Sequence, residues 1–189
     1  RSALESSAVS ELFSTAIEKQ SALNAWVAET EVHAASLSAS PNLQKMLAAL
    51  LVAKVSGEPA GIQAAHDNLV AELQVRSGPG QDYLGWMLLD PDTGQIIVAT
   101  DFAQEGKYRE NQAYFINGKS GPYLQNLYYS PSMQTVQLTV SAPVRSAQGT
   151  LLGVLAGDLN LEKMNTIITR RTGLRQSDDA FLVNSSELF

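Results

Sequence analysis

The sequence predicts an α+β protein in which helices come first and a mainly antiparallel sheet follows. Residues 1–38 contain no glycine and no proline, and Ala, Glu, Leu, Ser and Gln dominate them, which favours helix. From residue 83 onward, apolar runs alternate with short turns rich in Gly, Pro, Asp and Ser. Because helices and strands are grouped along the chain and do not alternate, we expect an antiparallel sheet and not a doubly wound parallel one.

The first expected helix, residues 1–38, carries a stripe of side chains that recur every three or four positions on one face. The stripe consists of Leu12, Ala16, Gln20, Leu23, Val27, Thr30, Ala34 and Leu37, widened by Phe13, Ile17 and Trp26. This face can pack on the protein's own domain or pair with a second copy of the helix. The polar residues Gln20 and Thr30 weaken a strict coiled-coil seam.

Two further helices are expected before residue 77. In "SASPN", Ser40 suits an N-cap and the following Pro suits the first turn of a helix over residues 41–55. A third helix is expected from residue 59 to residue 76, and "SGPGQD" (77–82) ends this helical part of the chain.

Strands dominate the rest of the chain, and they are expected at residues 83–90, 95–100, 124–129, 134–144 and 150–159. The turns between them contain "PDTG", "SPSM" and "RSAQG". A helix at 161–171 follows, with Asn160 as its expected N-cap. Tyr83, Trp86 and Phe115 are expected in the core.

The end of the chain echoes the start of the sheet. "TGLRQSDDAFLVNSS" (172–186) repeats the order of "SGPGQDYLGWMLLDPDTG" (77–94): a polar turn with Gly, an Asp, an aromatic residue and an apolar run. Two interpretations stay open. The segment is either an edge strand that completes the first sheet or the opening of a second, similar domain.

Composition and charge argue against several classes of function. The net charge of −6 and the pI of about 4.9 do not suit broad nucleic-acid binding, and we expect no nucleic-acid partner. The sequence has no cysteine, so neither a disulfide nor a thiolate metal site can form. Its longest apolar run, "MLAALLVA", is much shorter than the about 20 residues that span a bilayer. We therefore expect membrane attachment only through flanking segments that are not in this chain.

No constellation of catalytic or metal-ligating residues is apparent. His33 and His66 lie on expected helices, away from the strands, and each is expected to be a partly exposed helical residue. There is no GxSxG, HExxH or phosphate-loop motif, and "DPDTG" suits a hairpin turn better than a calcium loop. We expect no enzyme in this fragment, no metal and no cofactor, although a full-length protein could carry a kinase or cyclase output domain.

Four segments carry a family resemblance: "WMLLDPDTGQIIVATD" (86–101), "AYFINGKSGPYLQNLYYS" (113–130), "LTVSAPVRSAQGTLLGVLAGDLNLEKMNTII" (138–168) and "FLVN" (181–184). In order and spacing they resemble the double Cache sensor domain, a PAS-like extracytoplasmic family found in bacterial sensor histidine kinases, chemoreceptors and diguanylate cyclases. The domains that the resemblance implies are a stalk helix with two packing helices (1–76), a distal PAS-like Cache domain (77–160), a connecting helix (161–173) and the start of a truncated or reduced membrane-proximal second domain (174–189).

The resemblance also implies a ligand pocket. One wall is the sheet, and the other is the loop and short helix between the second and third strands, here residues 101–122. The candidate ligand-binding residues are Arg109, Gln112, Tyr114, Tyr123, Tyr129 and Asp158. The tyrosines would supply rings and hydroxyl groups. Asp158 lies at the acidic position that receives the ligand ammonium group in the amine and amino-acid binders of this family.

Several alternatives stay open at these positions. Amino-acid binders of the family carry an Arg two residues before the aromatic pair, where this chain has Gln112. Either Gln112 replaces that arginine with an uncharged amide, or Arg109 takes its role. Tyr128 and Tyr129 are adjacent on an expected strand, so at most one of them should line the pocket, and Tyr129 is favoured. Asp158 could instead cap the helix that follows it.

The sequence therefore predicts the extracytoplasmic (periplasmic) ligand-sensing portion of an inner-membrane bacterial receptor. It would bind a small polar molecule, which is an amino acid, an amine or a carboxylate-like compound. The signal would leave through its N-terminal helix, and a homodimer through that helix is a candidate assembly. The alternative is a dimerisation or periplasmic partner-binding module of the same fold that binds no ligand. A third interpretation, a cytoplasmic PAS-type haem or flavin sensor, is disfavoured because no cysteine is present and both histidines lie on helices.

Overall fold

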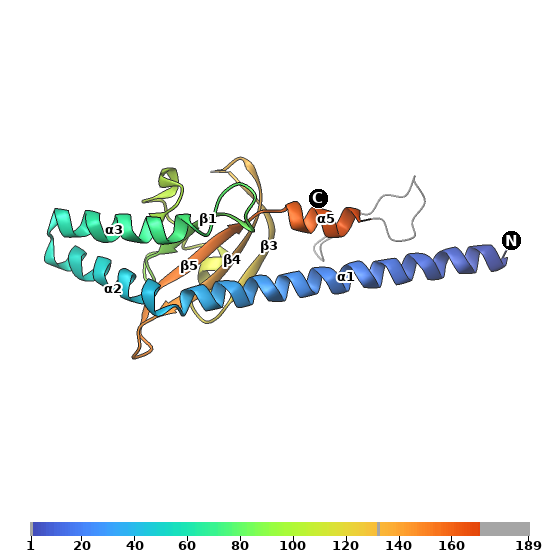
Figure 1. Cartoon of the computed structure of the whole chain (residues 1–189), viewed down its shortest axis with the longest axis horizontal. Helices are drawn as coiled ribbons and strands as arrows, with labels where there is room; N and C mark the ends of the chain where they lie inside the picture. Colours follow the sequence, from blue (N-terminus) through green and yellow to red (C-terminus); the bar gives the residue numbers. More distant parts are fainter. Residues whose placement is uncertain (1, 132, 171–189) are drawn as a thin grey trace. The chain divides into compact units, whose positions relative to one another are not determined.

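The structure is a computed structural model that describes residues 2–131 and 133–170 of the chain. Its helices are α1 (Ser2–Ser38), α2 (Pro41–Ser56), α3 (Pro59–Gln74), the 3-10 helix η1 (Phe102–Gln104), α4 (Ala113–Gly118) and α5 (Glu162–Thr169) (Figure 1). Its strands are β1 (Tyr83–Leu89), β2 (Ile96–Ala99), β3 (Tyr123–Ser130), β4 (Thr135–Arg145) and β5 (Leu151–Leu159). The predicted α+β class and the order of its elements are confirmed. The segment 172–186, predicted to be either an edge strand or the opening of a second domain, and the predicted start of that domain at 174–189 lie outside the described residues.

The described chain divides into two compact units. One contains the N-terminal part of α1 together with α5, and the other is Glu29–Asn160. In the first unit, Lys19 donates a side-chain hydrogen bond to the carbonyl of Ile168 on α5, and Thr15 is buried. The predicted stripe is only partly buried, because Phe13 and Ile17 are 67% and 64% exposed. The second unit contains the sheet.

The sheet has five strands in the order β2-β1-β5-β4-β3, and every neighbouring pair is antiparallel. The tight turn between β1 and β2 forms as "PDTG" predicts: the Gly94 N–H bonds the Asp90 carbonyl at 3.0 Å, and Gly94 has a φ of 70°. The register places Gly85 on β1 opposite Asp158 on β5, and Asp158 opposite Thr139 on β4. Side chains at paired positions lie on the same face of a sheet, so these three positions share one face.

The two faces of the sheet have different covers. Helix α2 packs against β5, and α3 packs against β1 and β2. On this helical face, Trp86 is 1% exposed and its indole N–H bonds the Arg76 carbonyl at 3.2 Å. On the other face, α4 packs against β3, β4 and β5 and buries Phe115 in a cluster with Met87 and Leu89. The predicted core positions of Tyr83, Trp86 and Phe115 are thus confirmed.

One predicted helix cap is wrong. Leu161, and not Asn160, occupies the N-cap position of α5. The Asn160 amide side chain donates to the Gln81 carbonyl at 3.2 Å, and its backbone N–H bonds the Asp82 carbonyl at 2.8 Å. These bonds tie the end of β5 to the segment before β1, which draws the side chain away from the helix.

Gly118 lets α4 lie close to β4. A Cβ atom at this position would be 2.4 Å from Ser141 Oγ and 2.9 Å from Ser141 Cβ. Ser141 Oγ in turn donates to the Tyr114 carbonyl at 2.7 Å, so it holds α4 in place. We expect Gly118→Ala to lower the free energy of unfolding by about 1–3 kcal/mol in urea denaturation, through overpacking. Gly121→Ala, where a Cβ would meet nothing within 4 Å, is the control, and an equal loss in both variants would contradict this role.

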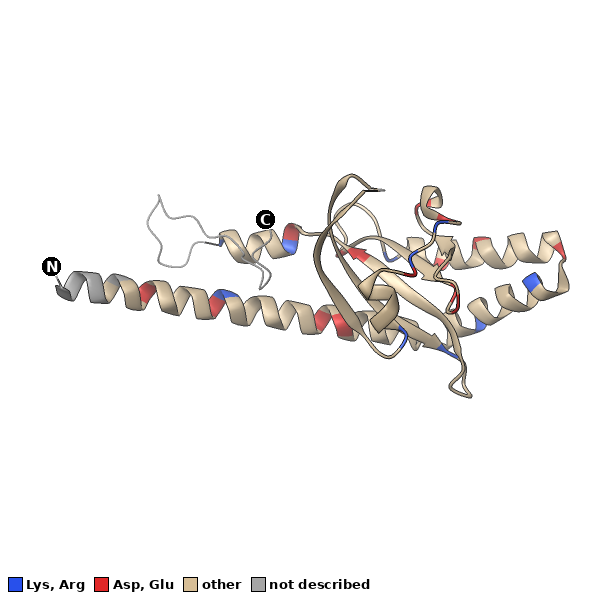
Figure 2. Ribbon diagram, turned by 180° about the vertical axis from the view of Figure 1, so that it is seen from behind, with Lys and Arg blue, Asp and Glu red and all other residues tan. Residues whose placement is uncertain are grey.

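Charged residues are dispersed over the described chain. Figure 2 shows lysine and arginine as scattered positions along the ribbon, not gathered on one element. Within the described residues, no helix combines the length and apolar character needed for a membrane span.

Candidate ligand-binding site

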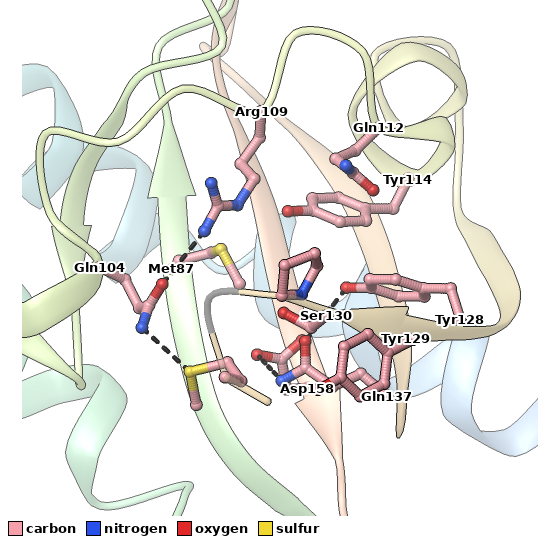
Figure 3. Close-up of a pocket in the computed structure, with 12 residues that line it drawn as sticks. Met87, Gln104, Arg109, Gln112, Tyr114, Tyr128, Tyr129, Ser130, Gln137 and Asp158 are labelled. Atoms are coloured by element: carbon pink, nitrogen blue, oxygen red, sulfur yellow. Dashed lines mark hydrogen bonds between the residues drawn. The ribbon is translucent and has the colours of Figure 1, made fainter. Parts of the chain in front are cut away.

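A cavity of about 230 Å³ lies between the sheet and the segment that connects β2 to β3. These are the two walls that the resemblance implies. The cavity is lined by Met87, Gln104, Arg109, Gln112, Tyr114, Tyr128, Tyr129, Ser130, Pro131, Met133, Gln137 and Asp158 (Figure 3). Five of the six candidate residues from the sequence therefore border one space, and Tyr123 does not.

Asp158 on β5 is the only acidic residue among those that line this cavity. Its Oδ1 accepts a hydrogen bond from Thr139 Oγ1 at 2.7 Å, and its Oδ2 accepts one from Gln137 Nε2 at 3.3 Å. Tyr128 extends this network, because its hydroxyl lies 2.8 Å from Thr139 Oγ1 and 3.3 Å from Gln137 Oε1. Asp158 thus bonds side chains of β4, whereas the N-cap position of α5 is occupied by Leu161 and has no side-chain cap. A carboxylate accepts about four hydrogen bonds, so Asp158 keeps capacity for a ligand.

The pKa shifts follow from burial. Burial raises the pKa of Asp158 above its ordinary value. The Thr139 hydrogen bond, the Arg109 charge and the Gln137 hydrogen bond act in the opposite direction and lower this pKa. Burial also raises the pKa of Tyr128 to about 12, and the Asp158 charge adds to that rise. The pKa of Tyr114 is raised as well, chiefly by burial. Both tyrosine hydroxyls therefore stay protonated at neutral pH. Burial disfavours the ionised form of Asp158, and a cation bound beside it would stabilise that form.

Arg109 brings a positive charge to the same cavity. Its Nη2 donates to Gln104 Oε1 at 3.1 Å and its Nη1 donates to the Tyr108 carbonyl at 3.0 Å. Figure 3 shows the guanidinium group on the cavity side of the loop, between Gln104 and the Tyr114 hydroxyl. Gln104 is 8% exposed, and its Nε2 also donates to Asp101 Oδ2 at 3.1 Å. A buried amide thus holds the arginine in place.

The remaining candidate residues differ in where they lie relative to the cavity. Gln112 occupies the N-cap position of α4 and lines the cavity. Tyr114 is 1% exposed, and its ring centroid lies 6.5 Å from that of Tyr128. Tyr129 lines the cavity and is 61% exposed. Tyr123 packs instead against the core cluster beside α4, and its carbonyl accepts a 3.3 Å hydrogen bond from Ser141 Oγ.

The expectation that at most one of Tyr128 and Tyr129 lines the pocket is wrong. Both tyrosines border the cavity, which extends past the end of β3 to Ser130, Pro131 and Met133. Tyr128, which was not favoured, makes the hydrogen bonds to Thr139 and Gln137.

Sequence reasoning also missed Gln104, Met133 and Gln137. For Gln137 a signal existed: polar residues alternate with apolar ones at Gln137, Thr139 and Ser141 on β4, yet all three are 6% exposed or less. Such alternation is typical of a solvent-facing side, and it equally suits the floor of a polar cavity. Gln104 lies in a polar loop, where no local pattern distinguishes a buried amide from an exposed one.

Neither histidine borders the cavity. The Nδ1 atom of His33, an exposed residue on α1, lies 3.0 Å from the Tyr83 hydroxyl. His66 Nε2 on α3 lies 2.8 Å from Glu105 Oε1. Among the described residues, no three His, Asp or Glu side chains gather in a way that could hold a metal ion.

No protein-family model matches this sequence, and no curated protein does. The solved structures that resemble the fold include three sensor or ligand-binding domains. The sensor domain of the V. cholerae histidine kinase DctB has a TM-score of 0.60 at 18% identity, covering 90% of this chain and 61% of that one. The ligand-binding domain of the Campylobacter jejuni chemoreceptor Tlp3, in complex with 4-methylisoleucine, has a TM-score of 0.59 at 13% identity, covering 89% and 64%. That of the Pseudomonas fluorescens chemoreceptor CtaA, in complex with L-serine, has a TM-score of 0.53 at 15% identity, covering 86% and 64%.

This chain thus spans about three fifths of the length of these solved structures. At these identities the likeness concerns the fold, which is shared with a histidine kinase sensor domain and with chemoreceptor ligand-binding domains. This shared fold is consistent with the Cache-type sensor domain that the sequence resembles.

Proposed function

We propose that this chain is the extracytoplasmic ligand-sensing domain of a transmembrane bacterial signalling receptor, and that its ligand is a small polar molecule with a positively charged amine. The observation that carries the proposal is Asp158. It is a carboxylate on the floor of a cavity of about 230 Å³, and burial raises its pKa. An ammonium group bound there would restore the favourable electrostatic environment that burial removes.

Arg109 supports the further proposal that another part of the same ligand carries an anionic group. The guanidinium lies across the cavity from Asp158 and its hydrogen-bond partners, and it is held by Gln104. A molecule with both an amine and a carboxylate, such as an amino acid, would meet an opposite charge at each of these residues. The CtaA and Tlp3 domains in complex with L-serine and 4-methylisoleucine make amino acids reasonable first probes.

A path from the cavity toward α1 supports a role in signalling. Tyr83 pairs with Leu159, the residue next to Asp158, and its hydroxyl contacts His33 Nδ1 at 3.0 Å. The same hydroxyl donates to the Thr30 carbonyl on α1 at 3.4 Å. A ligand that binds one arrangement of β1 and α1 more tightly than another would shift the population between them. We propose that the signal leaves through α1, whose N-terminal part could pair with a second copy in a homodimer.

A thermal-shift screen of amino acids, primary amines and carboxylic acids tests the proposal. A ligand at 100 times its dissociation constant stabilises a folded protein by about 2.7 kcal/mol, which raises the melting temperature by several degrees in a chain of this size. We expect such a rise with at least one amine-bearing compound. If no compound of the three classes raises the melting temperature, the ligand-free dimerisation or partner-binding module becomes the better account.

Binding should also depend on pH. An ammonium group binds the ionised carboxylate, so affinity for an amine should fall as pH falls through the pKa of Asp158. Because burial raises that pKa, the loss should begin at a higher pH than an ordinary aspartate would give. Isothermal titration calorimetry from pH 8 downward measures this, and affinity that stays constant until the protein unfolds would contradict a role for Asp158.

A further inference from the structure

A second cavity of about 100 Å³ adjoins the first. We call it the side cavity, and the cavity of about 230 Å³ the main cavity. The wall residues that the two have in common are Met87, Gln104, Met133, Gln137 and Asp158. Gln104 Nε2 lies 2.9 Å from Met133 Sδ, so this pair forms a partition between the two spaces. Asp158 borders both cavities, so a group bound to its carboxylate would lie next to both of them.

The side cavity is more apolar than the main one. Apart from the shared residues, its walls are Leu84, Gly85, Trp86, Ala99, Thr100, Asp101 and Thr135. Most of these belong to β1 and β2 or follow β2 directly. Neither a lysine nor an arginine lines it, unlike the main cavity with Arg109. Its two acidic residues are Asp158, the proposed partner of the ligand amine, and Asp101, which already accepts hydrogen bonds from the Ala103 backbone N–H and from Gln104 Nε2. The space beside them favours a small apolar group over an anionic one.

Gly85 leaves much of this space open. It pairs directly with Asp158, so a side chain at position 85 would project from the same face of the sheet. A Cβ atom there would lie 2.9 Å from Thr100 Oγ1 and would have no other heavy atom within 4 Å. Any larger residue would therefore extend into the side cavity beside the carboxylate.

We propose that the side cavity is a subsite for a short alkyl substituent of the ligand, and that Gly85 sets how large this substituent can be. The inference rests on the proposed function, because it takes Asp158 as the anchor of the ligand amine. The ligand class is then an amine with a short alkyl branch close to the ammonium group. The branch lies in the side cavity while the polar remainder lies in the main cavity.

The volume limits the branch to a few carbon atoms. A cavity of about 150 Å³ lined by apolar residues holds benzene, so about 100 Å³ suits a smaller group such as isopropyl or isobutyl. Burial of each methylene contributes about 0.8 kcal/mol, which corresponds to about fourfold in affinity. Affinity should therefore rise about fourfold per added carbon and stop rising once the side cavity is full.

Calorimetric titration with glycine, L-alanine, L-valine and L-leucine, and with the corresponding amines without a carboxylate, tests the subsite. Thr135→Leu adds side-chain volume to the side cavity, because Thr135 lines this cavity and not the main one. We expect it to leave glycine binding within about twofold and to remove the gain from longer branches. The matched control is Val136→Leu, since the neighbouring side chain on a strand points to the opposite face. Gly85→Ala is the second blocking variant.

The outcomes separate the two proposals. A rise along the series in the wild type that is lost in Thr135→Leu but kept in Val136→Leu supports the subsite. Binding that is equally tight across the series, or a rise that persists in both blocking variants, overturns the subsite alone. If no member of either series binds the wild type, the amine-binding function and the subsite are both overturned.

Discussion

Asp158→Asn should abolish amine binding and at the same time make the ligand-free protein more stable at neutral pH. The substitution keeps the shape of the side chain and removes its charge, so an ammonium group loses its ionic partner. Breaking a buried charge pair costs about 3–5 kcal/mol, so we expect affinity for an amine to fall at least 100-fold by calorimetry. Burial raises the pKa of Asp158, which means that ionising this group costs more free energy in the folded protein than in the unfolded chain.

The stability change has a definite sign and pH range. The folded-state pKa of Asp158 lies above the unfolded value, so its ionised form costs stability at high pH, and this cost disappears as pH falls below the unfolded pKa. The asparagine variant carries no such charge in either state. We expect its melting temperature to exceed that of the wild type by about 2–4 °C at pH 8 and by little at pH 4, corresponding to ~1 kcal/mol.

Asp92→Asn is the matched control, because Asp92 is exposed in the turn after β1 and borders neither cavity. It should change neither binding nor the pH profile of stability. If Asp158→Asn lowers stability at pH 8 while binding is unchanged, Asp158 serves the fold and not a ligand.

Arg109→Gln should separate ligands that have a carboxylate from those that do not. Charge-assisted hydrogen bonds contribute about 1.5–3 kcal/mol, so amino-acid affinity should fall about 10- to 100-fold. A simple amine should bind equally well or more tightly, because the positive Arg109 no longer shares the cavity with its ammonium group. Gln112→Ala removes only an uncharged amide, and we expect a loss of about tenfold or less.

The same pair of variants decides which residue takes the role of the family's arginine. A larger loss in Arg109→Gln than in Gln112→Ala assigns the carboxylate to Arg109, and the reverse order assigns it to Gln112. Arg145→Gln is the control, because Arg145 donates to the carbonyls of Gly149 and Lys119 and does not border the cavity. Calorimetry with one amino acid and its decarboxylated amine measures all of these effects.

Most of the fold could be predicted because the local sequence patterns favour the same helices, turns and strands that the folded protein contains. The glycine-free stretch before residue 39 became α1, and "PDTG" became the turn between β1 and β2. Grouped helices and strands gave the antiparallel sheet. The Asn160 cap was not predictable from local sequence, because bonds to the distant carbonyls of Gln81 and Asp82 determine its orientation.

The candidate site was less predictable, because it depends on register and on long-range contacts. Asp158 and Tyr114 were identified through the resemblance, but the roles of Tyr128 and Gln137 follow from their direct pairing across β3 and β4. Gln104 reaches the cavity only because the loop after β2 folds back so that its amide meets both Arg109 and Met133. No local pattern contains that information.

The most direct test of the account is a titration of the Asp158 carboxyl carbon by NMR, with and without a saturating amine found in the thermal-shift screen. We predict a pKa above the ordinary aspartate value in the ligand-free protein, caused by burial, and a lower pKa once the ammonium group is bound. An Asp158 pKa that is the same in the ligand-free and ligand-bound protein would contradict the proposal that this carboxylate receives the ligand.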